Sequence, residues 1–480
     1  MNERKRYAIV GAGGRHVLYR DALLGDFART AHLVALADTN PGRLALACRA
    51  ARERAGLDVP GYRGEDFDRM IAEARPDVVI VTTPDCHHHR YICRAMELGC
   101  DVITEKPMAI DAEQCAGILE ARRRTGRRCT VTFNYRFSPP RTQIKDLLGS
   151  GVIGRVLSVD FHWVLDLHHG ADYFRRWHRN KAVSGGLMVH KATHHFDLVN
   201  WWLSSVPETV YAAGHRRFYV PATAERYGLA GRGERCLDCP CAARCAFGLD
   251  LRAEAPLKRL YLDHEAHDGY FRDRCVFSDR IDIEDTVSCV VGYRGGATMS
   301  YSLTACSPWE GYTVNFTGTQ GRLEHRCEEV LPDPARAAHG APRTDRTQTR
   351  ICPHRGEPYD VPVWTGRGGH GGGDSTMLAY LFDPAGQEPD PYLRLADQRA
   401  GAWSILTGVA ANRSMASAQA VRIDALVADV GLPDYPPEPG RAAGPSDPPQ
   451  TPAGAGETGI YRSETAQRKK DHSVREKALE

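Results

Sequence analysis

The chain has 480 residues, of which 42% are hydrophobic and 25% are charged, as in an ordinary soluble globular protein. Its 62 Lys and Arg against 60 Asp and Glu give a formal net charge of +2, so no basic excess attracts nucleic acid or an anionic membrane. No stretch approaches the roughly 18 consecutive apolar residues of a membrane span. These numbers argue against a nucleic-acid coat, a membrane protein and a disordered scaffold.

The N-terminus passes from a short charged segment directly into the apolar run Tyr7–Val10. A secretory signal would need a longer apolar run and a cleavage site of small residues. We therefore expect a cytoplasmic protein, in which the 15 cysteines stay mostly reduced. A tight cysteine cluster in such a protein is more typical of metal binding than of disulfides.

The first 130 residues alternate between short apolar runs and helical patterns. Strands are predicted at 8–10, 33–37, 77–83 and 101–104, and helices at 43–55, 66–74, 88–98 and 112–125. Strands that alternate with helices in this way are typical of βαβ units around a parallel sheet. The length predicts two domains and a tail, and residues 1–130 are the first of these domains.

From residue 155 the pattern changes to strands of an antiparallel sheet. These strands are predicted at 156–164, 286–293, 297–303 and 312–317, with helices at about 186–203 and 397–415. Gly295 and Gly296 predict a tight hairpin turn. The second domain is expected to span 131–430, with a long polar loop at about 331–373. Residues 433–480 are rich in Pro, Gly, Ser and charge and are predicted to be a disordered tail.

A glycine-rich turn after the first strand predicts a dinucleotide site. Glycines allow a tight turn and bring backbone N–H groups close to a pyrophosphate at a helix N-terminus. Asp38 ends the second strand, where its carboxylate can accept hydrogen bonds from ribose hydroxyls. The third glycine of the usual pattern is His16 here, and a plain glycine-rich turn is the alternative. Candidate cofactor residues are Gly11, Gly13, Gly14, Arg15 and Asp38.

Asp38 also bears on the choice of dinucleotide. A carboxylate repels a 2′-phosphate, which favours NAD over NADP, whereas Arg43 nearby favours the opposite choice.

Three further segments carry a family resemblance. Thr83-Pro84-Asp85-Cys-His-His88 is followed by Glu105-Lys106-Pro107, and Gly185–Asp197 reads G-G-x-x-x-H-K-x-x-H-H-x-D. In this order they resemble the T-P-x-x-x-H, E-K-P and G-G-x-x-x-D-x-x-x-H-x-x-D signatures of the Gfo/Idh/MocA oxidoreductases, the group of glucose–fructose oxidoreductase and inositol dehydrogenase. The resemblance continues through Gly321–Glu324 to about residue 426 and omits the tail.

The resemblance implies an N-terminal Rossmann domain, with a doubly wound parallel sheet, and a C-terminal α/β domain with a large open antiparallel sheet. It implies that Lys106 lies beside the nicotinamide and hydrogen-bonds the reacting hydroxyl, that His194 is the acid/base, and that the chain forms a homo-oligomer, a dimer or tetramer. Imidazole and ammonium groups suit proton transfer and alkoxide stabilisation. Further cofactor contacts expected from the signatures are Thr83, Pro84, Asp85, His88, Glu105 and Lys106.

The histidines near the predicted base leave its identity open. His190 occupies the position at which the family usually has Asp, so His190 is a second catalytic candidate. His190 and His194 are four residues apart and share a helical face, a spacing that could also ligate zinc. His195 can be a substrate contact or a hydrogen-bonded core residue.

Polar and aromatic side chains around these motifs are candidate substrate contacts. Residues 169–178 are predicted to be a loop that presents donors to a polyhydroxylated ligand, with a solvated surface loop as the alternative. The glycine-rich segment 368–374 could cap the pocket or be a flexible hinge. The candidates are Tyr135, Arg136, His169, Asp172, Tyr173, Arg176, Trp177, Lys191, His195 and His370.

Five cysteines lie in an insertion at about 221–280 that has few apolar residues. A C-x-x-C turn lets two thiolates hold one ion, and two more thiolates complete a tetrahedral zinc site. We predict structural zinc held by Cys236, Cys239, Cys245 and Cys275, with Cys241 as the spare. Ordinary reduced thiols and an iron–sulfur cluster are the alternatives.

The leading functional prediction is an NAD-dependent oxidoreductase that acts on a ring hydroxyl of a small-molecule carbohydrate: a sugar, cyclitol or glycoside. The second hypothesis is an NAD-dependent glycoside hydrolase, which oxidises transiently, eliminates the aglycone and returns the hydride. A third is a non-catalytic NAD sensor. Neither nucleic acid nor a membrane is an expected partner.

Overall fold

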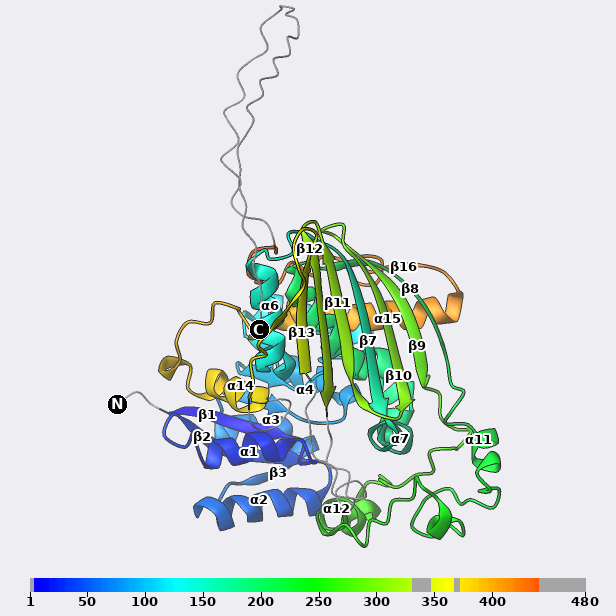
Figure 1. The fold of residues 1–480 in the computed structure, drawn as a ribbon. Coiled ribbons are helices and arrows are strands. Elements are labelled where there is room, and N and C mark those ends of the chain that lie inside the picture. Colours follow the sequence, from blue (N-terminus) through cyan, green and yellow to red (C-terminus); the bar gives the residue numbers. More distant parts are fainter. Residues whose placement is uncertain (1–3, 330–346, 367–371, 440–480) are drawn as a thin grey trace, which may run out of the picture. The chain divides into compact units, whose positions relative to one another are not determined.

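The computed structural model describes residues 4–329, 347–366 and 372–439, and two sheets organise them (Figure 1). Sheet A has seven strands in the order β15-β6-β5-β4-β1-β2-β3. Strands β1 to β6 pair in parallel, and β15 pairs antiparallel with β6. Its strands are β1 Lys5–Val10, β2 Ala31–Asp38, β3 Gly61–Arg63, β4 Val78–Val81, β5 Asp101–Thr104, β6 Cys129–Val131 and β15 Ala396–Asp397.

The apolar, β-prone runs of the first domain form its strands because both faces of sheet A are covered. All four residues of β4 are buried, as in a parallel sheet between helix layers. The helices are α1 His16–Leu24, α2 Pro41–Ala55, α3 Phe67–Ala74, α4 His88–Glu97 and α5 Ala112–Thr125. The strand order reverses at β1, which lies between β4 and β2. Ligands of open α/β sheets bind at the carboxyl ends of strands at such a point.

Sheet B has nine strands in the order β14-β13-β12-β11-β7-β10-β9-β8-β16. All its pairs are antiparallel except β10 with β7. Buried and more exposed residues alternate along β9 and β10, because one face packs on the core. The strands are β7 Val156–Asp166, β8 Pro207–His215, β9 Thr286–Tyr293, β10 Thr298–Ser307, β11 Glu310–Gly318, β12 Gly321–Glu329, β13 Thr347–Pro353, β14 Tyr359–Val361 and β16 Val421–Arg422.

Helices cover the inner face of sheet B and connect the two domains. Figure 1 shows α15 across this sheet, and α14 beside β1 of the first domain. The ring of Phe382 in α14 packs edge-on against Tyr7 of β1, with ring centroids 5.1 Å apart. The helices of this domain and its insertion are α6 Pro139–Gly149, α7 Leu167–Arg175, α8 Lys181–Ser184, α9 Leu187–His190, α10 Ala192–Leu203, α11 Pro221–Arg226, α12 Ala255–Leu260, α14 Gly373–Phe382 and α15 Gln398–Ser417.

The fold class is confirmed, and so is the hairpin: β9 and β10 pair antiparallel, and Gly296 has a φ of +85°. Three local predictions differ from the structure. Residues 169–175 are helical in α7, because Asp166 caps that helix by accepting from the backbone N–H groups of His168 and His169. The helix predicted at 186–203 is divided at Lys191.

The third difference concerns the segment predicted as a loop at 331–373, which contains β13 and β14. Its residues pair with β12 despite their polar composition, since one side of β13 packs inward through Ile351. Of the predicted tail, residues 433–439 carry no helix or strand, and the remainder lies outside the described residues. No described helix is long and apolar enough to span a membrane.

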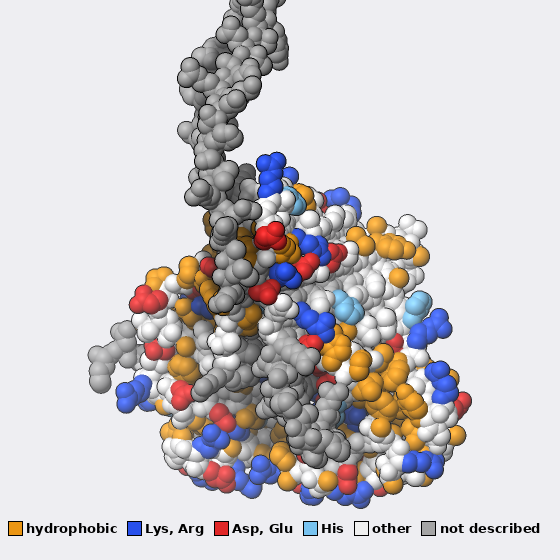
Figure 2. Space-filling model, viewed as in Figure 1, with side chains coloured by type: hydrophobic (Ala, Val, Ile, Leu, Met, Phe, Trp, Pro, Cys, Tyr) orange, Lys and Arg blue, Asp and Glu red, His pale blue; other side chains and the backbone are white. Residues whose placement is uncertain are grey.

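Charged side chains of both signs are interspersed on the face shown in Figure 2. This distribution agrees with the near-zero net charge of the chain.

Candidate active site

One cavity of about 1760 Å³ extends from the carboxyl ends of β1, β2, β4 and β5 to sheet B. Pockets for one small ligand usually measure about 300–1,000 Å³, so this cavity has room for a dinucleotide and a second ligand. The predicted residues that line it are Gly11, Gly13, Gly14, Arg15, Asp38, Thr83, Pro84, Asp85, His88, Glu105, Lys106, Tyr135, His169, Tyr173, Arg176, Trp177, His190, Lys191 and His194.

The turn between β1 and α1 requires glycine at its first position. Gly11 has a φ of +97°, and a Cβ there would stand 2.6 Å from the backbone nitrogen of Thr83. His16, at the position of the usual third glycine, turns inward and contacts the carbonyl oxygen of Gly13 with its Nδ1. Burial lowers the pKa of His16 to about 4, so a neutral ring closes the turn.

Asp38 is held by the backbone at the end of β2. Its Oδ2 accepts from Ala12 N–H at 2.5 Å, and its Oδ1 accepts from Asn40 N–H at 2.6 Å. The carboxylate lines the cavity, and its hydrogen bond from Ala12 connects the glycine-rich turn to the end of β2. Oxygen lone pairs remain for ribose hydroxyls, because a carboxylate has about four acceptor sites.

Two predicted cofactor residues, Arg15 and Glu105, pair with each other in the cavity wall. Arg15 Nε lies 2.6 Å from Glu105 Oε1, which also accepts from the Tyr19 hydroxyl at 2.5 Å. Burial opposes ionisation of Glu105, but Arg15 and Tyr19 hold its pKa below the usual value. Glu105 is therefore a fixed negative charge beneath the neighbouring Lys106.

Asp85, His190 and Lys106 form a chain of polar contacts at the bottom of the cavity. His190 Nδ1 lies 2.5 Å from Asp85 Oδ2, and His190 Nε2 lies 3.5 Å from Lys106 Nζ. Lys106 Nζ also donates to the His190 carbonyl oxygen at 3.4 Å. The family signature has Asp at the position of His190, and here the Asp85 carboxylate contacts the His190 imidazole, which in turn contacts Lys106.

The pKa values of Asp85, His190 and Lys106 depend on one another. Burial lowers the pKa of Lys106 to about 8, although Asp85 and Glu105 raise it. Burial raises the pKa of Asp85 well above its usual value, and Lys106 opposes that rise. Burial and the cations Lys106 and Arg176 hold the pKa of His190 well below its usual range. His190 is therefore a neutral ring near pH 7.

Aromatic rings surround the imidazole of His190. His178 lies edge-on at a centroid distance of 4.2 Å, and Trp177 and Tyr173 both lie at 5.7 Å. Trp177 itself stacks on His178 at 3.7 Å. These rings fix the orientation of His190 and give the cavity an apolar wall next to its charged groups.

His194 lines the same cavity from α10. Its ring stacks on Tyr135 with centroids 4.0 Å apart and planes inclined by 12°. The Tyr135 hydroxyl accepts from Lys191 Nζ at 3.3 Å, and this ammonium lies 4.8 Å from the centre of the Trp163 ring. His194 therefore presents a side chain of limited freedom to the cavity, as an acid/base group requires.

Three predicted substrate residues do not line the cavity. His195 is fully buried, and its Nδ1 lies 2.7 Å from the Tyr301 hydroxyl. Arg136 is buried in an ion pair with Asp197 at 2.6 Å. Both point into the core because each lies one position along a helical turn from a cavity residue, His194 or Tyr135, and successive helical residues are rotated by about 100–120° around the axis.

Asp172 is the third of these residues, and it binds Arg272 at 3.0 Å, which does line the cavity. His370 lies outside the described residues.

Several residues that line the cavity come from distant segments and carry no motif from which the sequence could predict them. Glu310 at the start of β11 is buried and accepts from His169 Nδ1 at 2.8 Å. Arg141 of α6 lies 4.1 Å from the centre of the Tyr135 ring and pairs with Glu329. A charged residue among buried positions was the available signal for Arg141. Other cavity residues that were not predicted are Tyr261, Asp268, Tyr270, Arg272 and Tyr312.

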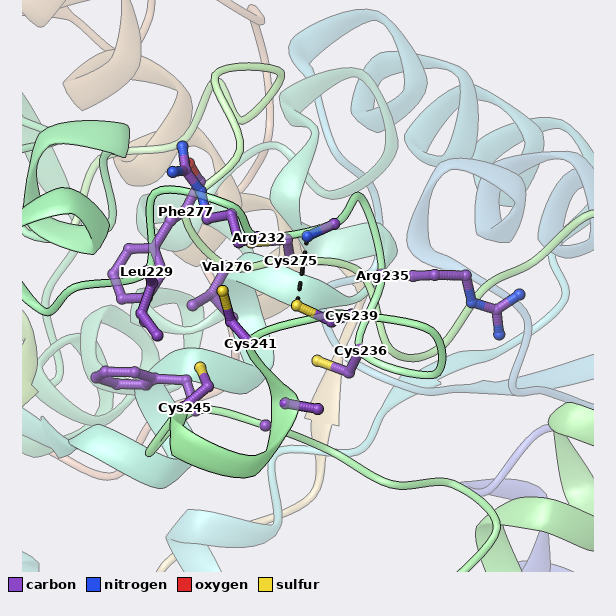
Figure 3. A pocket seen from close by; sticks show the side chains of 14 residues that line it. Leu229, Arg232, Arg235, Cys236, Cys239, Cys241, Cys245, Cys275, Val276 and Phe277 are labelled. Carbon is purple, nitrogen blue, oxygen red and sulfur yellow. Dashed lines mark hydrogen bonds between the residues drawn. The ribbon is translucent and has the colours of Figure 1, made fainter.

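Five thiols of the insertion surround a separate cavity of about 20 Å³ (Figure 3). An antiparallel bridge between Arg235 and Arg274 joins the two loops that carry Cys236 and Cys275. The backbone N–H of Gly233 donates to Cys239 Sγ at 3.3 Å. Within the described residues, no three His, Cys, Asp or Glu side chains already stand in the arrangement of a metal site, so the zinc prediction is not confirmed.

Two family models match the chain. The model described as "Oxidoreductase family, NAD-binding Rossmann fold" matches residues 5–133, and "Oxidoreductase family, C-terminal alpha/beta domain" matches residues 145–423. An oxidoreductase named YteT from Bacillus subtilis is 38% identical over 403 residues, which cover 82% of this chain and 92% of that protein. An inositol 2-dehydrogenase from Rubrobacter xylanophilus is 26% identical over 219 residues, 44% of this chain and 56% of that protein.

Solved structures share the fold at low identity. An aldose-aldose oxidoreductase from Caulobacter crescentus, complexed with glycerol, has a TM-score of 0.56 at 19% identity and covers 88% of this chain and 100% of its own. An oxidoreductase from Agrobacterium radiobacter, in complex with NAD+, L-tartaric acid and magnesium, has a TM-score of 0.59 at 17% identity with the same coverage. The chain therefore belongs to the Gfo/Idh/MocA family and is an NAD(P)-dependent oxidoreductase.

Proposed function

We propose that the protein oxidises a ring hydroxyl of a sugar, cyclitol or glycoside, with NAD as the hydride acceptor. The observation that carries the proposal is that Lys106, with its Asp85–His190 partner, lines the same cavity as the glycine-rich turn. The cavity wall beyond Lys106 includes His169, Glu310 and other groups able to hydrogen-bond a ring with several hydroxyls. Relatives named inositol 2-dehydrogenase act on a substrate of this class.

The residues around the glycine-rich turn fit NAD. The turn packs so closely that a Cβ on Gly11 would collide with backbone atoms of Thr82 and Thr83, and a pyrophosphate would lie at the start of α1, where the helix N-terminus favours an anion. Asp38 offers carboxylate oxygens for ribose hydroxyls and repels a 2′-phosphate. When bound, NAD supplies the group that accepts the hydride.

The proposed roles of the side chains follow from their charges. The Lys106 ammonium hydrogen-bonds the reacting hydroxyl and stabilises the developing alkoxide. His194 accepts the hydroxyl proton. Asp85 acts through His190 to position Lys106 and to raise its pKa against burial, so that the ammonium persists near neutral pH.

A substrate panel tests this function. Purified protein is incubated with NAD and a set of sugars, inositols and glycosides, and NADH is followed by its absorbance, with Lys106→Ala as the inactive control. Accumulation of NADH with one of these compounds supports the proposal. Release of an aglycone without NADH would instead establish the glycoside hydrolase alternative, and no turnover of any compound would reject both.

We also propose that the insertion holds one zinc ion through Cys236, Cys239, Cys245 and Cys275. The two loops that carry these thiols already meet, and the cavity between them has about the volume of one water-sized sphere. A zinc ion at this place would require rotation of these cysteine side chains about their Cα–Cβ bonds, so that the four thiolates converge on one point. Such an ion would stabilise a segment with few apolar residues.

Association into a dimer or tetramer through the outer face of sheet B stays a prediction. Leu157, Tyr211 and Val290 are large apolar residues of this sheet with at least 44% of their surface exposed. Light scattering of the purified chain and of Val290→Lys measures this association. The cytoplasmic location also stays a prediction.

A further inference from the structure

Residues 255–272 of the insertion, here called the capping segment, lie against the glycine-rich turn more than 200 residues away in sequence. The Tyr261 hydroxyl accepts from the backbone N–H of Gly14 at 3.0 Å. The carbonyl oxygen of His264 accepts from Asn40 Nδ2 at 2.9 Å, just after β2. Figure 1 shows α12, which begins this segment, beside the N-terminal end of α2. The segment therefore closes the cavity on the side of the pyrophosphate turn.

Close packing holds the capping segment in this place. A Cβ on Gly42 would stand 2.1 Å from His264 Nδ1, so glycine at the start of α2 permits the contact. Glu265 binds Arg235 through two hydrogen bonds of 2.9 Å each. Arg235 adjoins the cysteine cluster, and this connects the cluster to the cavity wall.

Arg43 lies between two carboxylates, one from each side of the cavity. Its Nη2 is 3.7 Å from Asp38 Oδ1 and also forms an ion pair with Asp268 of the capping segment. The Arg43 side chain is only 11% exposed. Without Asp268, Arg43 is the cation near the ribose that would attract a 2′-phosphate. Two carboxylates satisfy its charge and leave negative charge around the ribose position.

We propose that the capping segment is the outer wall of the dinucleotide site, in which Tyr261 binds the pyrophosphate and Asp268 enforces the choice of NAD over NADP. A tyrosine hydroxyl that accepts from Gly14 still has its own hydrogen to donate to a phosphate oxygen. The wall also slows cofactor release, because these contacts lie over the turn. This inference rests on the proposed binding of NAD and adds the residues that retain and select it.

Tyr261→Phe tests the pyrophosphate contact, with Tyr227→Phe as the matched control. Tyr227 lies in the same insertion, is 53% exposed and does not line the cavity. NADH dissociation is measured by stopped-flow fluorescence. Loss of one hydrogen bond to a charged group predicts about tenfold faster release from Tyr261→Phe and an unchanged rate in the control. Equal rates in both variants, or slower release from Tyr261→Phe, would overturn the role of Tyr261 as a cofactor contact.

Asp268→Asn tests cofactor choice, with Asp250→Asn as the control, because Asp250 is a 59% exposed residue of the same insertion. The ratio of NADP to NAD affinity is expected to rise about tenfold in Asp268→Asn, since one carboxylate no longer satisfies Arg43. An unchanged ratio would overturn the role of Asp268. If the wild-type chain bound neither cofactor, the proposed function itself would fail, which separates the two outcomes.

Discussion

The Nδ1 atom of His190 lies 2.5 Å from Oδ2 of Asp85, although 105 residues separate them in sequence. Asp85 follows β4 and His190 ends α9, so the contact joins the two domains at the cavity. The family signature places a carboxylate on the helix. Here the helix supplies an imidazole, and the turn after β4 supplies the carboxylate.

Asp85→Asn is expected to lower kcat about 10–100-fold and to move the alkaline decline of activity to lower pH. The Lys106 ammonium persists below its pKa of about 8 and is lost above it. The ionised carboxylate of Asp85 raises the pKa of Lys106, so the neutral amide of Asp85→Asn, which cannot ionise at any pH, lowers that pKa further. The measurement is kcat against pH for the wild type, Asp85→Asn and the exposed control Asp58→Asn. If kcat declined at the same alkaline pH in Asp85→Asn as in the wild type, Asp85 would have no effect on the pKa of Lys106.

Lys106→Ala should reduce turnover by about 10²–10⁴, the range for a group that stabilises charge or transfers a proton in the transition state. NAD affinity should stay within a few-fold, because the glycine-rich turn and Asp38 hold the dinucleotide. Steady-state kinetics and a binding titration measure the two quantities. If the variant kept more than half of the wild-type rate, Lys106 would not take part in the reaction.

His194→Asn and His195→Asn should differ sharply although the residues are adjacent. His194 lines the cavity, so its variant should lose turnover and keep its melting temperature and NAD binding. His195 is buried against Tyr301, so its variant should lose about 1–3 kcal/mol of stability and retain activity at low temperature. Thermal melts and kcat decide between these roles. An inactive His195→Asn that melted normally would reverse the assignment.

Asp38→Ala should weaken NAD binding and reduce discrimination against NADP. The carboxylate supplies ribose contacts and repels a 2′-phosphate. Its loss also removes the acceptor for Ala12 N–H, so a fall in thermal stability should accompany the change. Titration with both dinucleotides tests this, and an unchanged preference would show that Asp38 does not face the ribose.

Metal analysis of protein purified without added zinc should give about one zinc per chain. Cys239→Ser should lower the zinc content and the melting temperature by several degrees, because the ion would stabilise the insertion. Cys86→Ser is the control, since Cys86 lies outside the cluster. Absence of metal, or a visible charge-transfer band of an iron–sulfur cluster, would contradict the zinc proposal.

The βαβ order, the glycine-rich turn and the family could all be predicted from the amino-acid sequence, because they depend on local periodicity and on motifs of neighbouring residues. The resemblance of the short motifs around Lys106 and His194 to the family signatures also placed these two residues among the candidates. The helical pattern could not show that His194 faces the cavity and His195 faces the core. The two histidines are adjacent on one helix, and the sequence alone does not give the rotation of that helix relative to the cavity. The sequence pattern also predicted a loop where α7 forms, because the cap by Asp166 outweighs the polar composition.

The contacts between segments that are distant in sequence could not be predicted from local patterns and are known from the three-dimensional structure. The contact of Asp85 with His190 and the closure of the cavity by Tyr261 and Asp268 depend on packing between the domain surfaces. These partners come from elements with no common sequence pattern, and the hydrophobic core that brings them together is formed by residues from the whole described chain. The chemical properties of each side chain can be read from the sequence. Which charged groups lie next to one another depends on how the buried surfaces pack together.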